Sequence, residues 1–197
     1  RNGKPLIDYL MDKLFTDSLK VQISFTFQEK PLGFGDAVLR AEDFVNNEPF
    51  FVHADDGILT NGYIEGVKLY DELRPDAILF LRRVSNPSRY GIAVVRNEGT
   101  YNGYDLVRVL NVEEKPSNPK SNIAISAVYI FNRKIFEGLR SARANGELEL
   151  TYGIENMINS GGEVYGLLLN DDSWLSVGDP ESYFNTIYRT FNPHGGD

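Results

Sequence analysis

The chain has 197 residues, a formal net charge of −8 and no cysteine. Its 42% hydrophobic and 24% charged residues are ordinary for a globular protein, and we expect one domain over residues 1–197. The acidic balance argues against a broad basic surface for nucleic acid, and the lack of cysteine excludes disulfides and cysteine zinc sites. No apolar stretch approaches the roughly 20 residues that span a bilayer, and no signal peptide is visible, so we expect a soluble cytoplasmic protein with no membrane partner.

Helical and strand-like patterns alternate through the first half of the chain. Apolar residues recur at helical spacing in residues 6–14, 37–45 and 61–74. Strand-like runs occupy residues 21–27, 50–54 and 77–81. This β-α-β-α-β rhythm predicts a mostly parallel sheet with helices on both faces.

The second half is richer in strands. We expect strands in residues 92–95, 106–112, 123–131 and 164–169, with a Gly/Asn-rich turn at 97–104. Short helices are predicted around residues 135–139 and 154–157. The last helix is predicted to begin at Asp179-Pro180-Glu181, with Asp179 as its N-cap. Together these elements predict one α/β domain whose later strands form a mixed extension.

An acidic turn follows the apolar strand around Phe50–Val52. The strand ends in Asp55, Asp56 and Gly57. In an open α/β sheet ligands bind outside the carboxyl ends of the strands, where adjacent carboxylates can hold a divalent cation and, through it, phosphate oxygens. Asp-Gly is also a common turn dipeptide, so the pattern by itself leaves a plain turn open.

Two further loops carry candidate chemistry. The segment from Gln28 to Gly35 contains two glycines, which let backbone N–H groups approach an anionic ligand, although a plain tight turn explains them equally well. In Glu113-Glu114-Lys115-Pro116 the lysine could neutralise a phosphate and a glutamate could accept hydrogen bonds from sugar hydroxyls. An exposed run of charges is the alternative.

These pieces, taken in chain order, resemble the sugar-1-phosphate nucleotidyltransferases. The matching segments are residues 28–38, 48–56, 85–91, 112–116, 121–124, 146–151 and 174–183. The resemblance implies a Rossmann-like, three-layer α/β fold with a mixed, mostly parallel sheet. It also implies that the phosphate of a sugar 1-phosphate attacks the α-phosphorus of a nucleoside triphosphate, with Mg²⁺ as cofactor, giving a nucleotide sugar and pyrophosphate. UTP or dTTP and glucose 1-phosphate are the favoured substrates.

The resemblance also assigns roles to individual positions. The catalytic residues are Asp56, which would hold Mg²⁺, and Lys115, which would bind the sugar phosphate. A gapless match from Glu48-Pro49 selects Asp56 over Asp55. The remaining assignments are the nucleotide-binding residues Gln28 and Gly33 and the sugar-binding residues Gly91, Glu114, Lys115, Glu147 and Thr151.

The chain departs from the family pattern in four places. Ser176 stands where relatives have a second metal-binding aspartate, and Tyr152 replaces a usual aspartate. The Gly-rich loop that grips the triphosphate would precede Arg1, and a segment is expected to be missing between Leu14 and Phe15.

Two other functional classes stay open beside the enzyme. Because a serine hydroxyl is a poor substitute for a carboxylate, one alternative is a catalytically weakened homologue that binds nucleotide sugars as a regulatory or sensor protein. A glycosyltransferase is a third hypothesis, against which the Glu-Lys-Pro segment argues. The sequence leaves the oligomeric state open, a homo-oligomer included.

Overall fold

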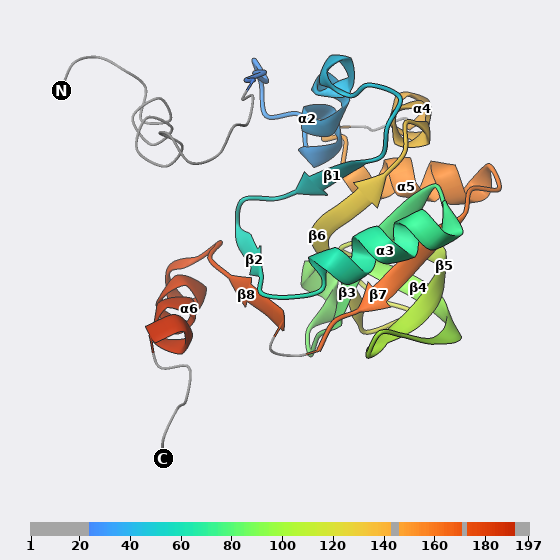
Figure 1. Ribbon diagram of the computed structural model, residues 1–197. Helices are drawn as coiled ribbons and strands as arrows, with labels where there is room; N and C mark the ends of the chain where they lie inside the picture. Colours follow the sequence, from blue (N-terminus) through green and yellow to red (C-terminus); the bar gives the residue numbers. More distant parts are fainter. Residues whose placement is uncertain (1–23, 143–145, 171–172, 192–197) are drawn as a thin grey trace, which may run out of the picture.

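The computed structural model describes residues 24–142, 146–170 and 173–191 (Figure 1). Its elements in chain order are α2 (Phe34–Arg40), a 3-10 helix (Glu42–Phe44), β1 (Phe50–His53), β2 (Gly57–Leu59), α3 (Tyr63–Leu73), β3 (Ala77–Arg83), a second 3-10 helix (Pro87–Arg89), β4 (Gly91–Tyr101), β5 (Tyr104–Glu114), β6 (Ile123–Phe131), α4 (Lys134–Ser141), α5 (Leu150–Asn159), β7 (Val164–Leu168), β8 (Trp174–Ser176) and α6 (Pro180–Phe191).

A six-stranded sheet forms the middle layer, in the order β1-β6-β3-β7-β5-β4. The first five residues of strand β3 are all buried. Because successive side chains of a strand point to opposite sides, both faces of β3 are therefore covered. Leu79 belongs to the core that also contains side chains of α4 and α5, whereas Phe80 packs with side chains of α3. Figure 1 shows α3 lying across one face of the sheet. The predicted three-layer α/β architecture with a mixed sheet is therefore confirmed.

The expectation of a mostly parallel sheet is wrong for the described strands. Strands β1 and β3 do run in the same direction, as a β-α-β unit requires, but β6 lies between them and is antiparallel to both. Only β3 and β7 are parallel neighbours within the described residues. The alternation of strands and helices in the first half predicts that β1 and β3 run in the same direction. It carries no information about β6, a later strand that pairs between them.

Where the structure describes them, the elements predicted for residues 6–45 agree less well with it than the later ones do. The helix at 6–14 lies outside the described residues, and so do residues 21–23 of the first predicted strand. Residues 24–27 of that strand form no strand, and Phe27 is exposed. Its alternating pattern has no described strand beside it to complete a hydrogen-bonded ladder. The predicted helix at 37–45 is instead α2 followed by the short 3-10 helix.

Strands β4 and β5 form a long hairpin, and both are longer than the predicted strands at 92–95 and 106–112. Only Asn102 and Gly103 lie between the strands, and both have positive φ, of 48° and 90°. Such a two-residue turn matches the right-handed twist of the flanking strands. The region predicted as a loop at 97–104 is therefore mostly strand.

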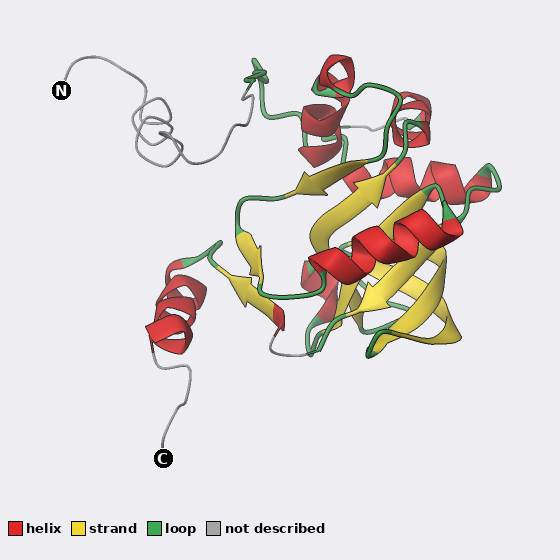
Figure 2. Cartoon of the chain, in the orientation of Figure 1, coloured by secondary structure: helices red, strands yellow, loops and turns green. Residues whose placement is uncertain are grey.

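A small two-stranded ribbon, which no sequence pattern predicted, joins the acidic turn to the end of the chain. Strand β2 pairs antiparallel with β8, and Gly57 lies opposite Ser176. Figure 2 shows this ribbon and the following helix α6 to one side of the large sheet. Asp179 caps α6 as predicted, because its Oδ1 accepts a 3.0 Å hydrogen bond from the backbone N–H of Ser182.

Candidate functional site

A pocket of about 390 Å³ lies where the ends of β1, β4 and β5 meet the start of α5. Five residues assigned from the sequence line it, each from a different stretch of the chain except the adjacent Glu114 and Lys115. The full lining consists of Phe34, Ala54, Asp55, Asp56, Arg89, Tyr90, Gly91, Glu114, Lys115, Ile125, Ala127, Tyr129, Glu149, Leu150 and Thr151. The fold thus gathers Asp56, Gly91, Glu114, Lys115 and Thr151 around one cavity.

Glu114 is the centre of a small polar network on the pocket wall. Its Oε1 lies 3.3 Å from Nζ of Lys115, and its Oε2 accepts a 2.8 Å hydrogen bond from Oγ1 of Thr151. The charge and hydrogen bond of Glu114 raise the pKa of the Lys115 ammonium, which therefore stays cationic. Glu149 and Glu147 add to this effect through their charges.

The backbone of Lys115 adopts an unusual conformation. Its φ is +39°, in the left-handed region where a residue with a side chain is strained. The backbone N–H of Lys115 donates a 3.1 Å hydrogen bond to the carbonyl of Tyr90, which holds this conformation. Strand β5 thus ends at Glu114, and the next residue, Lys115, turns the chain and lines the pocket.

Gly91 fits its place because of its small size. It pairs with Glu114 across the hairpin of β4 and β5. A Cβ at Gly91 would come within 2.9 Å of Cγ2 of Thr151 and 3.4 Å of Oε2 of Glu114. Any larger residue would therefore push against the hydrogen-bonded pair of Thr151 and Glu114.

The acidic turn lines the same pocket through Asp55 and Asp56. The carbonyl of Asp56 accepts a 2.8 Å hydrogen bond from the backbone N–H of Val177. A Cβ at Gly178 would lie 3.3 Å from Oδ2 of Asp56. The end of β8, with Ser176 opposite Gly57, therefore runs beside the turn, as expected if this segment contributes to the same site.

The loop that begins at Gln28 packs against the segment before α5. The side-chain amide of Gln28 donates hydrogen bonds to the carbonyl of Gly33 (3.1 Å) and to Oδ2 of Asp36 (2.7 Å). The hydrogen bond from Gln28, together with Arg40, lowers the pKa of Asp36. Gly33 has φ +99°, and a Cβ there would meet the backbone of Leu148.

Three of the assigned residues are outside the lining of the pocket. Gln28 and Gly33 lie together in their loop, and Glu147 stands next to Leu148, whose N–H donates a 2.6 Å hydrogen bond to the carbonyl of Leu32. Their assigned roles stay predictions.

Sequence reasoning missed several residues of the pocket wall. Glu149 is the clearest case: burial and the charge of Glu114 raise the pKa of its carboxyl group. Its position in the matching segment 146–151, two residues after Glu147, was the only available signal. Arg89 and Tyr90, which lie in the matching segment 85–91, and Tyr129 also line the pocket, and none of the three was singled out from the sequence.

Four carboxylates and two cations line the pocket. The carboxylates are Asp55, Asp56, Glu114 and Glu149, against Arg89 and Lys115. No group of three or more histidine, cysteine or carboxylate side chains is arranged to hold a metal within the part of the chain that the structure describes. Mg²⁺ is commonly bound by only one or two carboxylates together with water and substrate phosphates, so an acidic pocket of this kind fits such an ion.

None of the described helices is long and apolar enough to cross a membrane.

Comparison with known proteins gives the same family as the sequence motifs. Residues 6–191 match the family model for nucleotidyl transferases. A glucose-1-phosphate thymidylyltransferase from Streptomyces antibioticus is 32% identical over 162 residues, which cover 81% of this chain and 43% of the relative. A UTP–glucose-1-phosphate uridylyltransferase from Mycoplasma genitalium is 35% identical over 152 residues, covering 67% of this chain and 47% of the relative.

Solved structures resemble the fold. A UDP-glucose pyrophosphorylase in complex with UDP-glucose matches with a TM-score of 0.73 at 23% identity, covering 87% of this chain and 66% of that one. A UTP-bound UGPase from Acinetobacter baumannii has a TM-score of 0.76 at 22% identity, covering 96% of this chain and 67% of that one. The chain belongs to the nucleotidyl transferase family, and the resemblance to sugar-1-phosphate nucleotidyltransferases is confirmed. It spans less than half the length of the curated relatives named here.

Proposed function

We propose that the protein transfers a nucleotidyl group to a hexose 1-phosphate, with UTP or dTTP as donor and glucose 1-phosphate as the favoured acceptor. A phosphate oxygen of the sugar 1-phosphate attacks the α-phosphorus of the triphosphate, the bond to the β-phosphate breaks, and pyrophosphate leaves. The observation that carries the proposal is the meeting of Asp56, Gly91, Glu114, Lys115 and Thr151 around one pocket.

Lys115 and Glu114 have complementary tasks in this reaction. The Lys115 ammonium, kept cationic by Glu114, neutralises the phosphate of the acceptor sugar. Glu114 offers carboxylate oxygens to sugar hydroxyls, and Thr151 fixes the orientation of that carboxylate. Gly91, which has no side chain, lines the pocket beside them and is proposed to contact the sugar through its backbone. No protein nucleophile is needed, because positioning and charge neutralisation lower the barrier.

Asp56 is the residue proposed to hold Mg²⁺, with Asp55 next to it on the pocket wall. The ion would supply neutralisation of charge on the phosphate oxygens. Ser176 supplies a neutral hydroxyl where the second carboxylate is expected. Ser176 pairs with Gly57, directly after the acidic turn, and lies outside the lining of the pocket, so the proposed ion would be held by the chain with less negative charge.

A release assay for pyrophosphate tests the proposal directly. The complete protein is incubated with Mg²⁺, glucose 1-phosphate and either UTP or dTTP, and the K115M variant serves as control. We expect release that depends on both substrates and falls strongly in K115M. No turnover with any pair of nucleotide and sugar phosphate would overturn the catalytic proposal.

A nucleotide-sugar sensor is the second candidate, favoured by Ser176 beside the acidic turn. A protein of this kind would bind UDP- or dTDP-glucose in the same pocket without turning over the substrates. Calorimetric titration with the nucleotide sugar, run beside the release assay, separates the two: binding without release supports the sensor, and release with substrate saturation supports the enzyme.

A further inference from the structure

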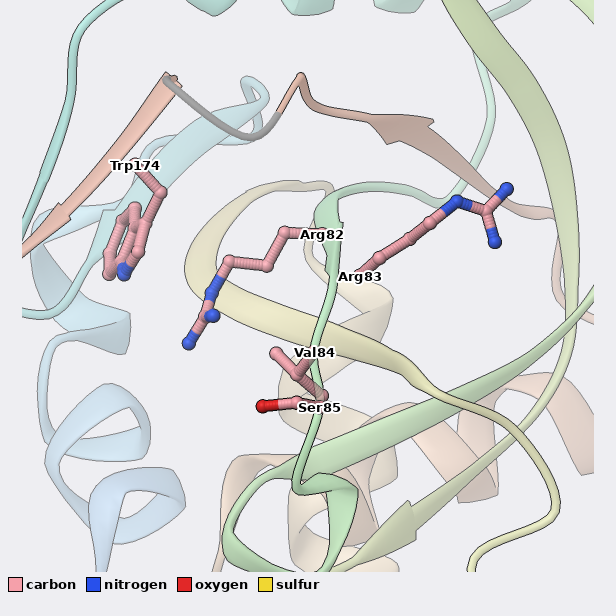
Figure 3. A pocket seen from close by; sticks show the side chains of 5 residues that line it. All are labelled: Arg82, Arg83, Val84, Ser85 and Trp174. Carbon is pink, nitrogen blue, oxygen red and sulfur yellow. The ribbon is translucent and has the colours of Figure 1, made fainter.

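A second cavity, of about 380 Å³, opens at the end of β3. Figure 3 shows its lining residues, Arg82, Arg83, Val84, Ser85 and Trp174. Two of these five are arginines and none is acidic, although the chain as a whole carries a net charge of −8. The cavity is therefore locally basic in an acidic protein, the charge pattern that attracts an anion.

Arg82 is held in place by aromatic rings. Its Cζ lies 4.7 Å from the centroid of the Tyr90 ring and 5.9 Å from the centroid of the Trp174 ring. Guanidinium groups bind to such faces by cation–π attraction and stacking. Because both rings belong to other elements than β3, they fix the position of the guanidinium before any ligand arrives.

The charge of Arg82 has no counter-ion within the described residues. None of their ion pairs includes it, and its Nε is buried without a hydrogen-bond partner. Several arginines elsewhere in the fold do have such a partner: Arg96, Arg108 and Arg133 each lie within 3.2 Å of a glutamate oxygen. A buried donor without a partner costs free energy, and no acidic side chain of the described residues balances the charge of this guanidinium at ion-pair distance.

Strand geometry singles out Arg82 over Arg83. Neighbouring side chains on a strand point to opposite sides, and Figure 3 shows Arg83 directed away from the Trp174 side of the cavity. The hydroxyl of Ser85 lies on the same side as the guanidinium of Arg82 in that view. The cavity thus offers a planar fork of donors and a neighbouring hydroxyl, the combination that binds phosphate oxygens.

Tyr90 links this cavity to the acidic pocket. It lines the pocket of Asp56 and Lys115 and also lies against Arg82. The two cavities are thus neighbours of opposite charge: the acidic pocket suits a cation, and the basic one suits an anion.

We propose that the Arg82 cavity is a binding site for a phosphate-bearing ligand, with Arg82 as the principal donor and Ser85 as a second one. The phosphate can belong to the phosphate chain of a nucleotide that also occupies the acidic pocket, or to a separate phosphate-bearing molecule. Binding at Arg82 is independent of catalysis, so a failure of the release assay leaves it intact.

Trp174 provides a local signal for the test, because it is the only tryptophan of the chain and lies against Arg82. Inorganic pyrophosphate is titrated into the 197-residue chain in EDTA, which prevents binding through a metal at Asp56. Tryptophan fluorescence and calorimetry are recorded together. We expect a saturable fluorescence change accompanied by binding heat.

The matched variants are R82Q and R83Q, which remove the same charge from adjacent residues. R82Q is expected to weaken pyrophosphate binding at least tenfold, whereas R83Q changes it less than threefold. R82K keeps the charge but loses the planar fork, and it should fall between wild type and R82Q. Circular dichroism shows whether each variant is folded. Equal affinity in wild type and a folded R82Q, or no binding heat in wild type, overturns the proposal.

A competition arm identifies the source of the phosphate. Titration of pyrophosphate is repeated in the presence of saturating UTP and Mg²⁺. Loss of the Arg82-dependent signal supports the phosphate chain of the nucleotide as the ligand. A retained, Arg82-dependent signal supports a separate phosphate-bearing molecule. Retention of the signal in R82Q under these conditions contradicts both.

Discussion

Oγ1 of Thr151 donates a 2.8 Å hydrogen bond to Oε2 of Glu114, and this contact joins the first turn of α5 to the last residue of β5. Thr151 is buried, so the bond is protected from water. The other oxygen of the same carboxylate faces Lys115. The orientation of Glu114 is therefore set from both sides.

Replacing Thr151 by valine is expected to weaken use of the sugar phosphate. A hydrogen bond to a charged group contributes about 1.5–3 kcal/mol, so T151V should lower kcat/KM for glucose 1-phosphate by about tenfold or more. T151S keeps the hydroxyl and should retain most of the activity. Steady-state kinetics with varied sugar phosphate measures the effect. Equal kcat/KM in T151V and T151S would contradict the role given to this bond.

Replacing Gly91 by alanine is expected to destabilise the fold by about 1–3 kcal/mol, the usual cost of overpacking. The new Cβ would lie 2.9 Å from Cγ2 of Thr151. T151S lacks that methyl group, so the same substitution in the T151S background should cost less. Urea denaturation of the four variants of this cycle measures the difference. An identical cost in both backgrounds would show that the strain lies elsewhere.

Asp76 is a buried carboxylate that joins β3 to two other segments. Its Oδ1 lies 2.8 Å from Nζ of Lys134 and accepts a 2.8 Å hydrogen bond from Asn132, and its Oδ2 accepts one of 2.9 Å from the N–H of Glu163. Burial acts to raise the pKa of Asp76, but these partners outweigh it and lower the pKa below its ordinary value.

The depressed pKa of Asp76 predicts acid sensitivity. Its contribution to folding is complete above the ordinary carboxyl pKa and is lost as the pH falls through the lower pKa of the folded state. D76N should cost about 1.5–3 kcal/mol near neutral pH, with a smaller cost at pH 3. D71N, which alters an exposed pair with Arg74, should stay within about 0.5 kcal/mol of wild type. Urea denaturation at several pH values is the measurement, and a D76N cost that does not change with pH would refute the expectation.

Replacing Ser176 by aspartate is expected to strengthen the response to Mg²⁺. The residue lies opposite Gly57, directly after the acidic turn. A second carboxylate there should lower the Mg²⁺ concentration for half-maximal pyrophosphate release by roughly tenfold. The neutral variant S176N is the control. If S176D and S176N respond alike to Mg²⁺, Ser176 is not at a metal position.

The sequence predicted the helices and strands themselves better than it predicted which strands pair with one another. Periodicity found β3 and α3 because each is long enough to show its pattern. It missed β2 and β8, which have three residues each and no room for a period. It also missed the place of β6 between β1 and β3, because strand order depends on contacts between segments far apart in the chain.

The residues of the candidate site were predictable where they lie in a recognisable sequence motif. Asp56, Glu114 and Lys115 lie in short, recognisable segments, and the structure gathers them around one pocket. Arg82 was not predicted, because an arginine pair at the end of a strand resembles any exposed charge. Its significance comes from the rings of Tyr90 and Trp174, which reach it only after folding.

The short ribbon of β2 and β8 has a consequence for the order of events during synthesis. The backbone partner of Asp56 is Val177, near the end of the chain. The Glu114–Thr151 contact joins residues no later in the chain than α5, whereas the acidic turn is held by the later strand β8 and by Val177. The chain from the acidic turn through Val177 must therefore have emerged from the ribosome before the turn can take its final shape.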